Sequence, residues 1–127
     1  SLSIDIRSTQ DAGRQAAVRA IEQAIEAICL RRGVRYQLQI ALEVAASPCN
    51  SPLRATLGEA IGRSGLPLFE LASGAGHDAM MMAHLTPTAM LFVRCGNNGI
   101  SHNPLETMTL DDAELAAQVF MDFLQHA

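Results

Sequence analysis

The spacing of apolar residues predicts a β-α-β unit at the start of the chain. In residues 2–7 every second residue is apolar, a pattern typical of a strand with one buried face. Residues 11–32 carry apolar positions at steps of three and four, after Ser8 and Asp11 at capping-box spacing and before Gly33, which together predict a helix of about 22 residues. Residues 34–44 alternate over a longer run and predict a second strand with one polar face.

Two prolines in residues 45–52 interrupt this pattern and mark a predicted hinge. The pair Ser51-Pro52 predicts the cap and first turn of a second helix, which Gly65 ends. Residues 68–71 predict a short strand, and residues 77–85 predict a further helical segment.

The last third of the pattern completes the predicted fold. The apolar run Ala89–Val93 predicts a strand covered on both faces. Thr109 and Asp112 stand at capping-box spacing and predict a final helix that runs to the chain end. The predicted fold class is therefore α/β, with one domain over residues 1–46 and a second over residues 47–127.

Composition narrows the classes of function. Only 17% of the residues are charged and nearly half are apolar, which indicates a folded chain. The nine basic residues are scattered arginines and the aromatic residues are four phenylalanines and one tyrosine, so we expect no nucleic-acid partner. No apolar run reaches the roughly 20 residues of a membrane span, no signal peptide is visible, and the three cysteines show no pairing pattern. We therefore expect a cytoplasmic protein with no membrane partner. The chain starts in mid-alternation without an initiator methionine, so we also expect a piece of a longer polypeptide.

Two histidines in glycine-bearing turns are the first candidates for chemistry. His77 follows Gly76 at the start of a predicted helix, where its ring and nearby N–H groups could face an anion or a polarised carbonyl. His102 lies between Gly99 and Pro104 beyond the apolar run, where a loop can present a ring nitrogen to a metal or a substrate. The pattern leaves open that His77 only starts a helix and that His102 only hydrogen-bonds to its own turn.

Arg7 stands beside Asp5 on the polar face of the first predicted strand. It is a candidate fork for a substrate carboxylate, and the alternative is a surface ion pair with Asp5. The chain has no HExxH and no paired Cys/His spacing, whereas a catalytic zinc site has about three protein ligands. We therefore do not expect the chain to build a metal site by itself from the candidates His77, Asp78, His84, His102 and Glu106.

Three segments in this order resemble the peptidase M20 superfamily: Ser73–Ala79 (SGAGHDA), Met90–Val93 and Gly99–Glu106 (GISHNPLE). The branch that they resemble contains allantoate amidohydrolase, N-carbamoyl-L-amino-acid hydrolase and β-ureidopropionase, and Asp5–Arg7 is similar to its D-x-R strand. The resemblance covers the whole chain but only the C-terminal portion of such an enzyme. It implies a homodimer whose metallopeptidase-like α/β catalytic domain is interrupted by a lid. Residues 1–46 then correspond to a β-α-β half of a ferredoxin-like lid, and the remaining residues to the closing segment of the catalytic domain.

The resemblance also implies a role for each candidate residue. His102 corresponds to a metal ligand, His77 and the Gly76 backbone to the contact that steadies the scissile carbonyl, and Arg7 to the group that grips the substrate carboxylate. The implied cofactors are two divalent metal ions, zinc or manganese, which activate water to hydrolyse a ureido or carbamoyl C–N bond while a glutamate moves the proton. That glutamate and the other ligands are not among these residues. We therefore expect the chain alone to hold no metal stably and to be inactive.

The implied substrate is a small molecule, allantoate or an N-carbamoyl amino acid. Two alternatives stay open: a non-catalytic binding or dimerisation module, which would use the strand edges of residues 1–45, and a fragment of an M20 aminopeptidase, which the GISHNP form of the loop disfavours. In a ferredoxin-like lid a further strand would lie between the two that are present here. We therefore expect these two strands to pair directly, or to be exchanged between chains.

Overall fold

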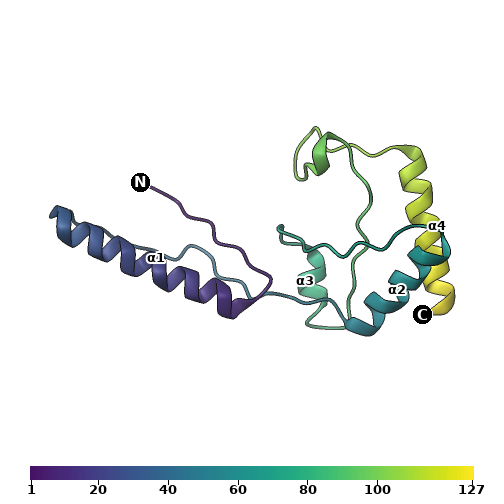
Figure 1. Cartoon of the computed structure of the whole chain (residues 1–127), viewed down its shortest axis with the longest axis horizontal. Coiled ribbons are helices and arrows are strands. Elements are labelled where there is room, and N and C mark those ends of the chain that lie inside the picture. Colours follow the sequence, from purple (N-terminus) through teal and green to yellow (C-terminus); the bar gives the residue numbers. More distant parts are fainter. The chain divides into compact units, whose positions relative to one another are not determined.

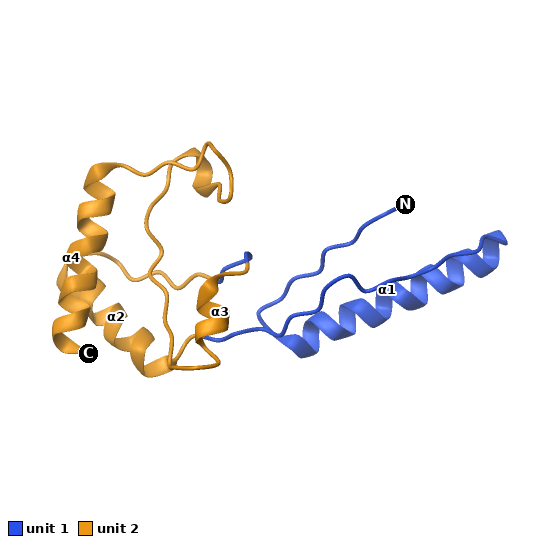
Figure 2. Ribbon diagram, turned by 180° about the vertical axis from the view of Figure 1, so that it is seen from behind, with its two compact units in different colours: residues 1–48, 72–75 blue, residues 49–71, 76–127 orange.

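The computed structural model describes all residues from 1 to 127 and contains helices but no strand. The chain divides into two compact units (Figure 2). Unit 1 comprises residues 1–48 and 72–75, and unit 2 comprises residues 49–71 and 76–127.

Helix α1 (Asp11–Arg32) dominates unit 1, and its predicted length of 22 residues is confirmed. It ends as predicted at Gly33, which takes the left-handed conformation (φ 63°), while the N–H of Val34 donates to the carbonyl of Cys29 at 3.0 Å in a Schellman arrangement. The predicted capping box is wrong. The N-cap is Gln10, without a side-chain cap bond.

Asp11 is engaged elsewhere, which explains the missing capping box. Its Oδ1 accepts from the backbone N–H of Ala46 at 3.1 Å and from Nη2 of Arg14 at 3.1 Å. Arg14 also donates to Glu43 at 3.2 Å, and its side chain is mostly buried. These bonds tie the first turn of α1 to the end of the following extended segment.

The predicted strands at residues 2–7 and 34–44 are wrong for this structure, and so is the predicted direct pairing between them. No backbone hydrogen bond joins the two segments. A strand exists only when a neighbour at ladder distance takes up its N–H and C=O groups, and alternation cannot supply that neighbour. The alternating apolar side chains therefore stay largely exposed; Leu42, for example, is 82% exposed.

The same correction applies to the two shorter predicted strands. Residues 68–71 and 89–93 run without a ladder partner. The second of these is only partly buried, not covered on both faces, although Leu91 packs against the core of unit 2. The α/β class predicted from the sequence is therefore not the class of this structure, which is helical.

Helices α2 (Ser51–Arg63) and α4 (Leu110–His126) pack against each other and form the core of unit 2 (Figure 1). The core consists of Leu57 and Ala60 from α2 and Val119 from α4, and the partly buried residues around it are Ile61, Leu66, Leu91 and Phe123. Arg63 and Asp122 join the two helices by an ion pair at 2.7 Å.

Both of these helices have a side-chain N-cap, and one of the two caps is the predicted residue. Thr109 caps α4 as predicted, because its Oγ1 accepts from the N–H of Asp112 at 3.1 Å. The predicted cap of α2 is wrong by one residue: Asn50, not Ser51, accepts from the N–H of Leu53 at 3.1 Å. Asparagine accepts such a bond as well as serine does, so the sequence alone did not separate the two positions.

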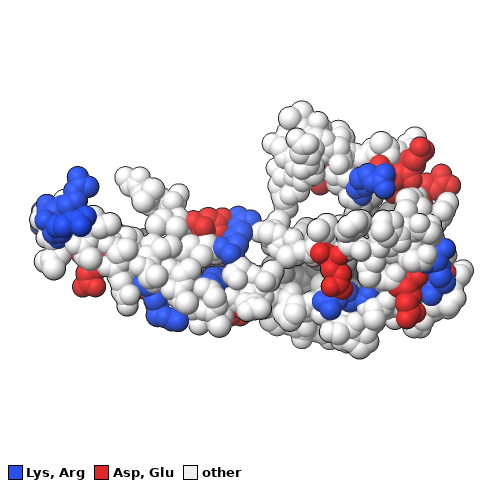
Figure 3. All heavy atoms as spheres, in the orientation of Figure 1, with Lys and Arg blue, Asp and Glu red and all other residues white.

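Two short elements complete unit 2: α3 (Asp78–Met82), within the predicted helical segment, and the single 3₁₀ turn η1 (Asn97–Gly99). None of the helices combines the length and the apolar character that crossing a bilayer requires. On the face drawn in Figure 3, basic side chains lie in small groups, most of them beside acidic ones.

Candidate functional site

A closed loop carries His102. In this loop, residues 96–107, the N–H of Gly96 donates to the carbonyl of Thr107 at 2.8 Å, and the side-chain amide of Asn97 donates to the carbonyl of Leu105. A Cβ at Gly96 would lie 2.5 Å from Oγ1 of Thr107, so a side chain there would require Thr107 to shift. The loop is thus closed by its own backbone and not by packing against the helices.

His102 has a left-handed backbone conformation, which is uncommon for a residue other than glycine. Its φ is 55°, and Asn97 and Asn98 in the same loop have φ values of 50° and 60°. Asparagine tolerates this left-handed region, whereas for most other residues it costs about 1–2 kcal/mol. A histidine at such a position must be held there by its surroundings.

The turn that follows His102 supplies that support. Oε2 of Glu106 accepts from the backbone N–H of His102 at 2.9 Å. Oδ1 of Asn103 accepts from the N–H of Leu105 at 2.9 Å, and the N–H of Glu106 donates to the carbonyl of Asn103 at 2.9 Å. With Pro104 in the next position, the Asn103 bonds are those of a helix N-cap, whereas the Glu106 bond reaches His102, one residue before it, and no helix follows.

His77 lies immediately before α3 and acts as its N-cap residue. Its backbone is extended (φ −131°, ψ 157°), and its side chain makes no capping bond, so the imidazole is free for other contacts. Gly76, just before it, does not have a positive φ, and an added Cβ there would lie at an ordinary 3.8 Å from Sδ of Met80.

The structure brings the two predicted histidines together within unit 2. The ring centroids of His77 and His102 lie 6.4 Å apart, and the ring planes are inclined by 51°. Both side chains are exposed. Two imidazoles at this separation can contact the same small molecule, one from each side of its reacting group.

Arg7 belongs to unit 1, where it forms the ion pair that the sequence left open as the alternative. Its Nη2 lies 2.5 Å from Oδ2 of Asp5, its Nε donates to the same carboxylate at 3.0 Å, and its Nη1 donates to the carbonyl of Gly74. The hydrogen bond from Arg7 lowers the pKa of Asp5, and the same bond raises the pKa of Arg7. The guanidinium stays charged and exposed, which a carboxylate ligand requires.

The residues of this chain do not by themselves form a metal site. No three His, Cys, Asp or Glu side chains converge so as to hold an ion. An exposed imidazole such as that of His102 is of the type that can bind zinc, but a catalytic zinc site has about three protein ligands. Asp78, His84 and Glu106 do not complete the set with the two histidines.

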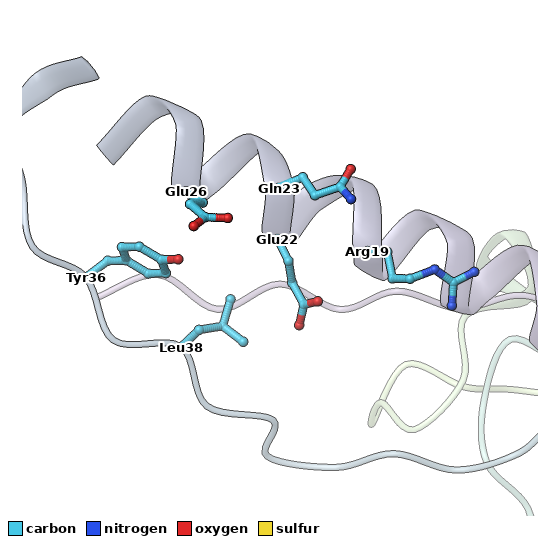
Figure 4. Close-up of a pocket in the computed structure, with 6 residues that line it drawn as sticks. All are labelled: Arg19, Glu22, Gln23, Glu26, Tyr36 and Leu38. Carbon is cyan, nitrogen blue, oxygen red and sulfur yellow. The ribbon is translucent and has the colours of Figure 1, made fainter. Parts of the chain in front are cut away.

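Unit 1 contains a separate hollow of about 330 Å³ between α1 and the following extended segment (Figure 4). Its walls carry two carboxylates and one guanidinium from the helix and the side chains of Tyr36 and Leu38; the helix residues are Arg19, Glu22, Gln23 and Glu26. None of the residues predicted to take part in the site lines it.

Comparison with known proteins decides the family. Residues 4–126 match the peptidase family M20/M25/M40. The chain belongs to the M20 family. It is 37% identical to allantoate deiminase 2 of Glycine max, over 98% of this chain and 27% of that protein. It is 32% identical to N-carbamoyl-L-amino-acid amidohydrolase of a Pseudomonas species, over 94% of this chain and 29% of that protein.

An allantoate amidohydrolase of Escherichia coli is 35% identical, over 88% of this chain and 27% of that enzyme. This M20 chain therefore spans only between a quarter and a third of the length of these relatives. No solved structure matches the chain.

From the sequence, Glu106 is one of the candidate metal ligands, and its bond to the backbone of His102 is not predicted. The order Asn103-Pro104-Leu105-Glu106 resembles a helix start, but that motif would place the Glu106 carboxylate on the N–H of Asn103, one residue further along the chain. The contact of Asn97 with Leu105 had no signal in the sequence either, because it joins residues on opposite sides of a loop.

Proposed function

We propose that this chain is the C-terminal portion of a metal-dependent amidohydrolase that hydrolyses a ureido or carbamoyl C–N bond in allantoate or an N-carbamoyl amino acid. The observation that carries the proposal is the similarity, over nearly the whole chain, to proteins whose names give both of these activities. The proximity of His77 and His102 supports it, because the two histidines expected to act on one substrate lie 6.4 Å apart.

The proposal gives each candidate residue a separate role. His102 supplies one metal ligand through its imidazole. His77, with the Gly76 backbone, steadies the scissile carbonyl and the charge that develops on it. Arg7 binds the substrate carboxylate through its exposed planar guanidinium, and the substrate then takes the place of the Asp5 carboxylate on that fork. When bound, the two divalent metal ions supply an activated water at neutral pH.

The remaining metal ligands and the proton-transferring glutamate would come from residues outside these 127. In the longer polypeptide, residues 1–7 and 34–44 would become strands of a lid that also forms a homodimer, and residues 47–127 would close a metallopeptidase-like α/β domain. The alternating apolar side chains of residues 34–44 support the lid assignment, because one face of that segment is ready to be buried. The 127-residue chain alone would then be inactive.

The decisive experiment uses the natural polypeptide that contains these residues, purified and supplied with Mn²⁺ or Zn²⁺. We expect ammonia release from allantoate or decarbamoylation of an N-carbamoyl amino acid, and loss of the activity when chelator removes the metal. A reading frame that holds only these residues, together with no turnover of either substrate class, would refute the proposal in favour of a non-catalytic module. Preferred turnover of dipeptides would point to an aminopeptidase.

A matched pair of variants tests the proposed role of Arg7. Arg7→Lys should raise KM for carboxylate-bearing substrates, because lysine keeps the charge but loses the bidentate fork. Arg94→Lys is the control, because Arg94 lies in the other unit and only approaches Asp112 at 3.5 Å on an exposed surface. Equal KM values for both variants would remove Arg7 from the proposed site.

A further inference from the structure

We propose that Glu106 is a positioning residue for His102: its carboxylate holds the His102 backbone in the left-handed conformation that turns the imidazole toward the position shared with His77. This inference rests on the proposed role of His102. In this role Glu106 contacts neither substrate nor metal. It is therefore not a further metal ligand.

Glu106 contacts the backbone of His102 directly. Oε2 of Glu106 accepts from the N–H of His102 at 2.9 Å, a charge-assisted bond to the residue with φ 55°. This is the bond in the turn that acts directly on the amide of His102. When a residue occupies an unfavourable backbone region, a bond to its own amide is an effective way to keep it there.

The bond between Glu106 and His102 does not stabilise the start of a helix. In a capping box, the glutamate at the third position reaches back to the N-cap N–H and thereby stabilises the helix that follows. Here the chain after Glu106 is not helical, and the next helix begins at Leu110 with Thr109 as its own cap. The bond therefore acts on His102 and not on a helix.

Glu106 is the acceptor that the amide of His102 uses, and the two oxygens of Asn103 serve other donors. Oδ1 of Asn103 accepts from the N–H of Leu105, and the carbonyl of Asn103 accepts from the N–H of Glu106 itself. If Glu106 is shortened, the amide of His102 loses its partner, and the favoured extended backbone becomes accessible. The ring of His102 would then turn away from its place 6.4 Å from that of His77.

The test compares Glu106→Ala, which removes the acceptor, with Glu106→Gln, which keeps an acceptor oxygen at the same reach but removes the charge. Glu59→Ala is the matched control, because Glu59 is an exposed carboxylate on α2 whose contact with Arg63 is as long as 3.8 Å. All variants are made in the natural polypeptide that contains these residues. Selective ¹⁵N-histidine labelling reports the His102 amide, which is assigned by its absence in His102→Ala, and calorimetry reports Zn²⁺ affinity.

For Glu106→Ala we expect the His102 amide signal to move upfield, its coupling to Hα to change to that of an extended residue, and Zn²⁺ affinity to fall about 10–100-fold, as for other residues that orient a metal ligand. Glu106→Gln should restore the amide signal and most of the affinity, and Glu59→Ala should change neither. An unchanged amide signal or unchanged affinity in Glu106→Ala would overturn the proposal. Equal losses in both Glu106 variants would also overturn it, because the charge and not the hydrogen bond would then be the cause.

The proposed function fails in a different way. If His102→Ala binds Zn²⁺ as tightly as the unaltered protein, then His102 is not a ligand, and both its proposed role and the positioning role of Glu106 fall, whereas turnover still tests the amidohydrolase activity. If His102→Ala loses affinity while Glu106→Ala does not, the proposed function stands and only the positioning role is refuted.

Discussion

The imidazole rings of His77 and His102 lie 6.4 Å apart, although one precedes a short helix and the other lies in a loop beyond a long extended segment. Neither ring is placed by the core of unit 2, which consists of side chains from α2 and α4. Their proximity instead depends on the turn before α3 and on the closed loop of residues 96–107. Both are local structures: the Ser73 side chain hydrogen-bonds to Ala75 in the turn, and backbone and side-chain hydrogen bonds together close the loop.

Substitution should separate the roles of the two histidines. In the natural polypeptide, His77→Ala should lower kcat by about 10²–10³ without loss of bound metal, as removal of one carbonyl-stabilising donor does in other enzymes. His102→Ala should lose metal as well as activity. Turnover and metal content, measured on the same preparations, check this prediction, with His84→Ala as the control because His84 is absent from the ring pair. Full metal content in His102→Ala would contradict it.

The loop closure should depend on the absence of a side chain at Gly96. Gly96→Ala places a Cβ 2.5 Å from Oγ1 of Thr107, so we expect a loss of about 1–3 kcal/mol in the free energy of unfolding, the usual cost of overpacking. Gly62→Ala is the matched control: it lies in α2 with open space around it, and alanine there should stabilise the chain by about 0.5–1 kcal/mol. Urea denaturation of both variants measures the difference. If Gly96→Ala is as stable as Gly62→Ala, then Thr107 can move away from the added methyl group at little cost.

The core of unit 2 is small, so one truncation should have a large effect. Leu57 is 6% exposed between α2 and α4, and Leu57→Ala should destabilise the unit by about 2–5 kcal/mol through lost burial and a residual cavity. That is a large share of the about 5–15 kcal/mol that stabilises a typical domain. Leu110→Ala, at a position 87% exposed, should change the stability little. Thermal melting by circular dichroism compares the two variants.

The bond between Asp11 and Ala46 should show in the pH dependence of unit 1. The N–H of Ala46, and then Arg14, lower the pKa of Asp11. A lowered carboxyl pKa means that its stabilisation is fully present above the ordinary value of about 3.9 and is lost as the pH falls through the lower folded value. The ¹H shift of the Ala46 amide should therefore titrate with a midpoint below about 3.9.

Asp11→Asn provides the control for that titration. The asparagine carbonyl can still accept from Ala46, but it does not ionise in this range, so the amide shift should become independent of pH. A wild-type midpoint at or above the ordinary value would contradict the lowered pKa. So would a titration that persists in Asp11→Asn.

The helices could be predicted from the sequence, because their determinants are local. Apolar spacing and Gly33 set the length of α1, and Thr109 with Asp112 sets the start of α4. The strands could not be predicted in the same way. The alternation over residues 34–44 describes side chains, whereas a strand also needs a neighbour for its backbone, and no segment of this chain lies in that place.

The candidate site shows the same limit. The sequence indicated His77 and His102 as candidates, because glycine-bearing turns and a resemblance to known motifs are both visible in the order of residues. The resemblance implied that both histidines serve one site, but the separation and inclination of the rings could not be predicted, since they depend on how the loop of residues 96–107 closes on itself. Nor did the sequence indicate that Asp11 would bind Ala46 instead of forming a capping box with Ser8.

The left-handed backbone of His102 has a further consequence for engineering. Glycine or asparagine would occupy φ 55° at lower cost, so selection for thermal stability alone should replace the histidine, and the imidazole would be lost with it. The position is thus a stability–activity trade-off confined to one residue. Redesign that scores only folding free energy should leave His102 unchanged. Stabilising changes should be sought in α2 and α4 instead.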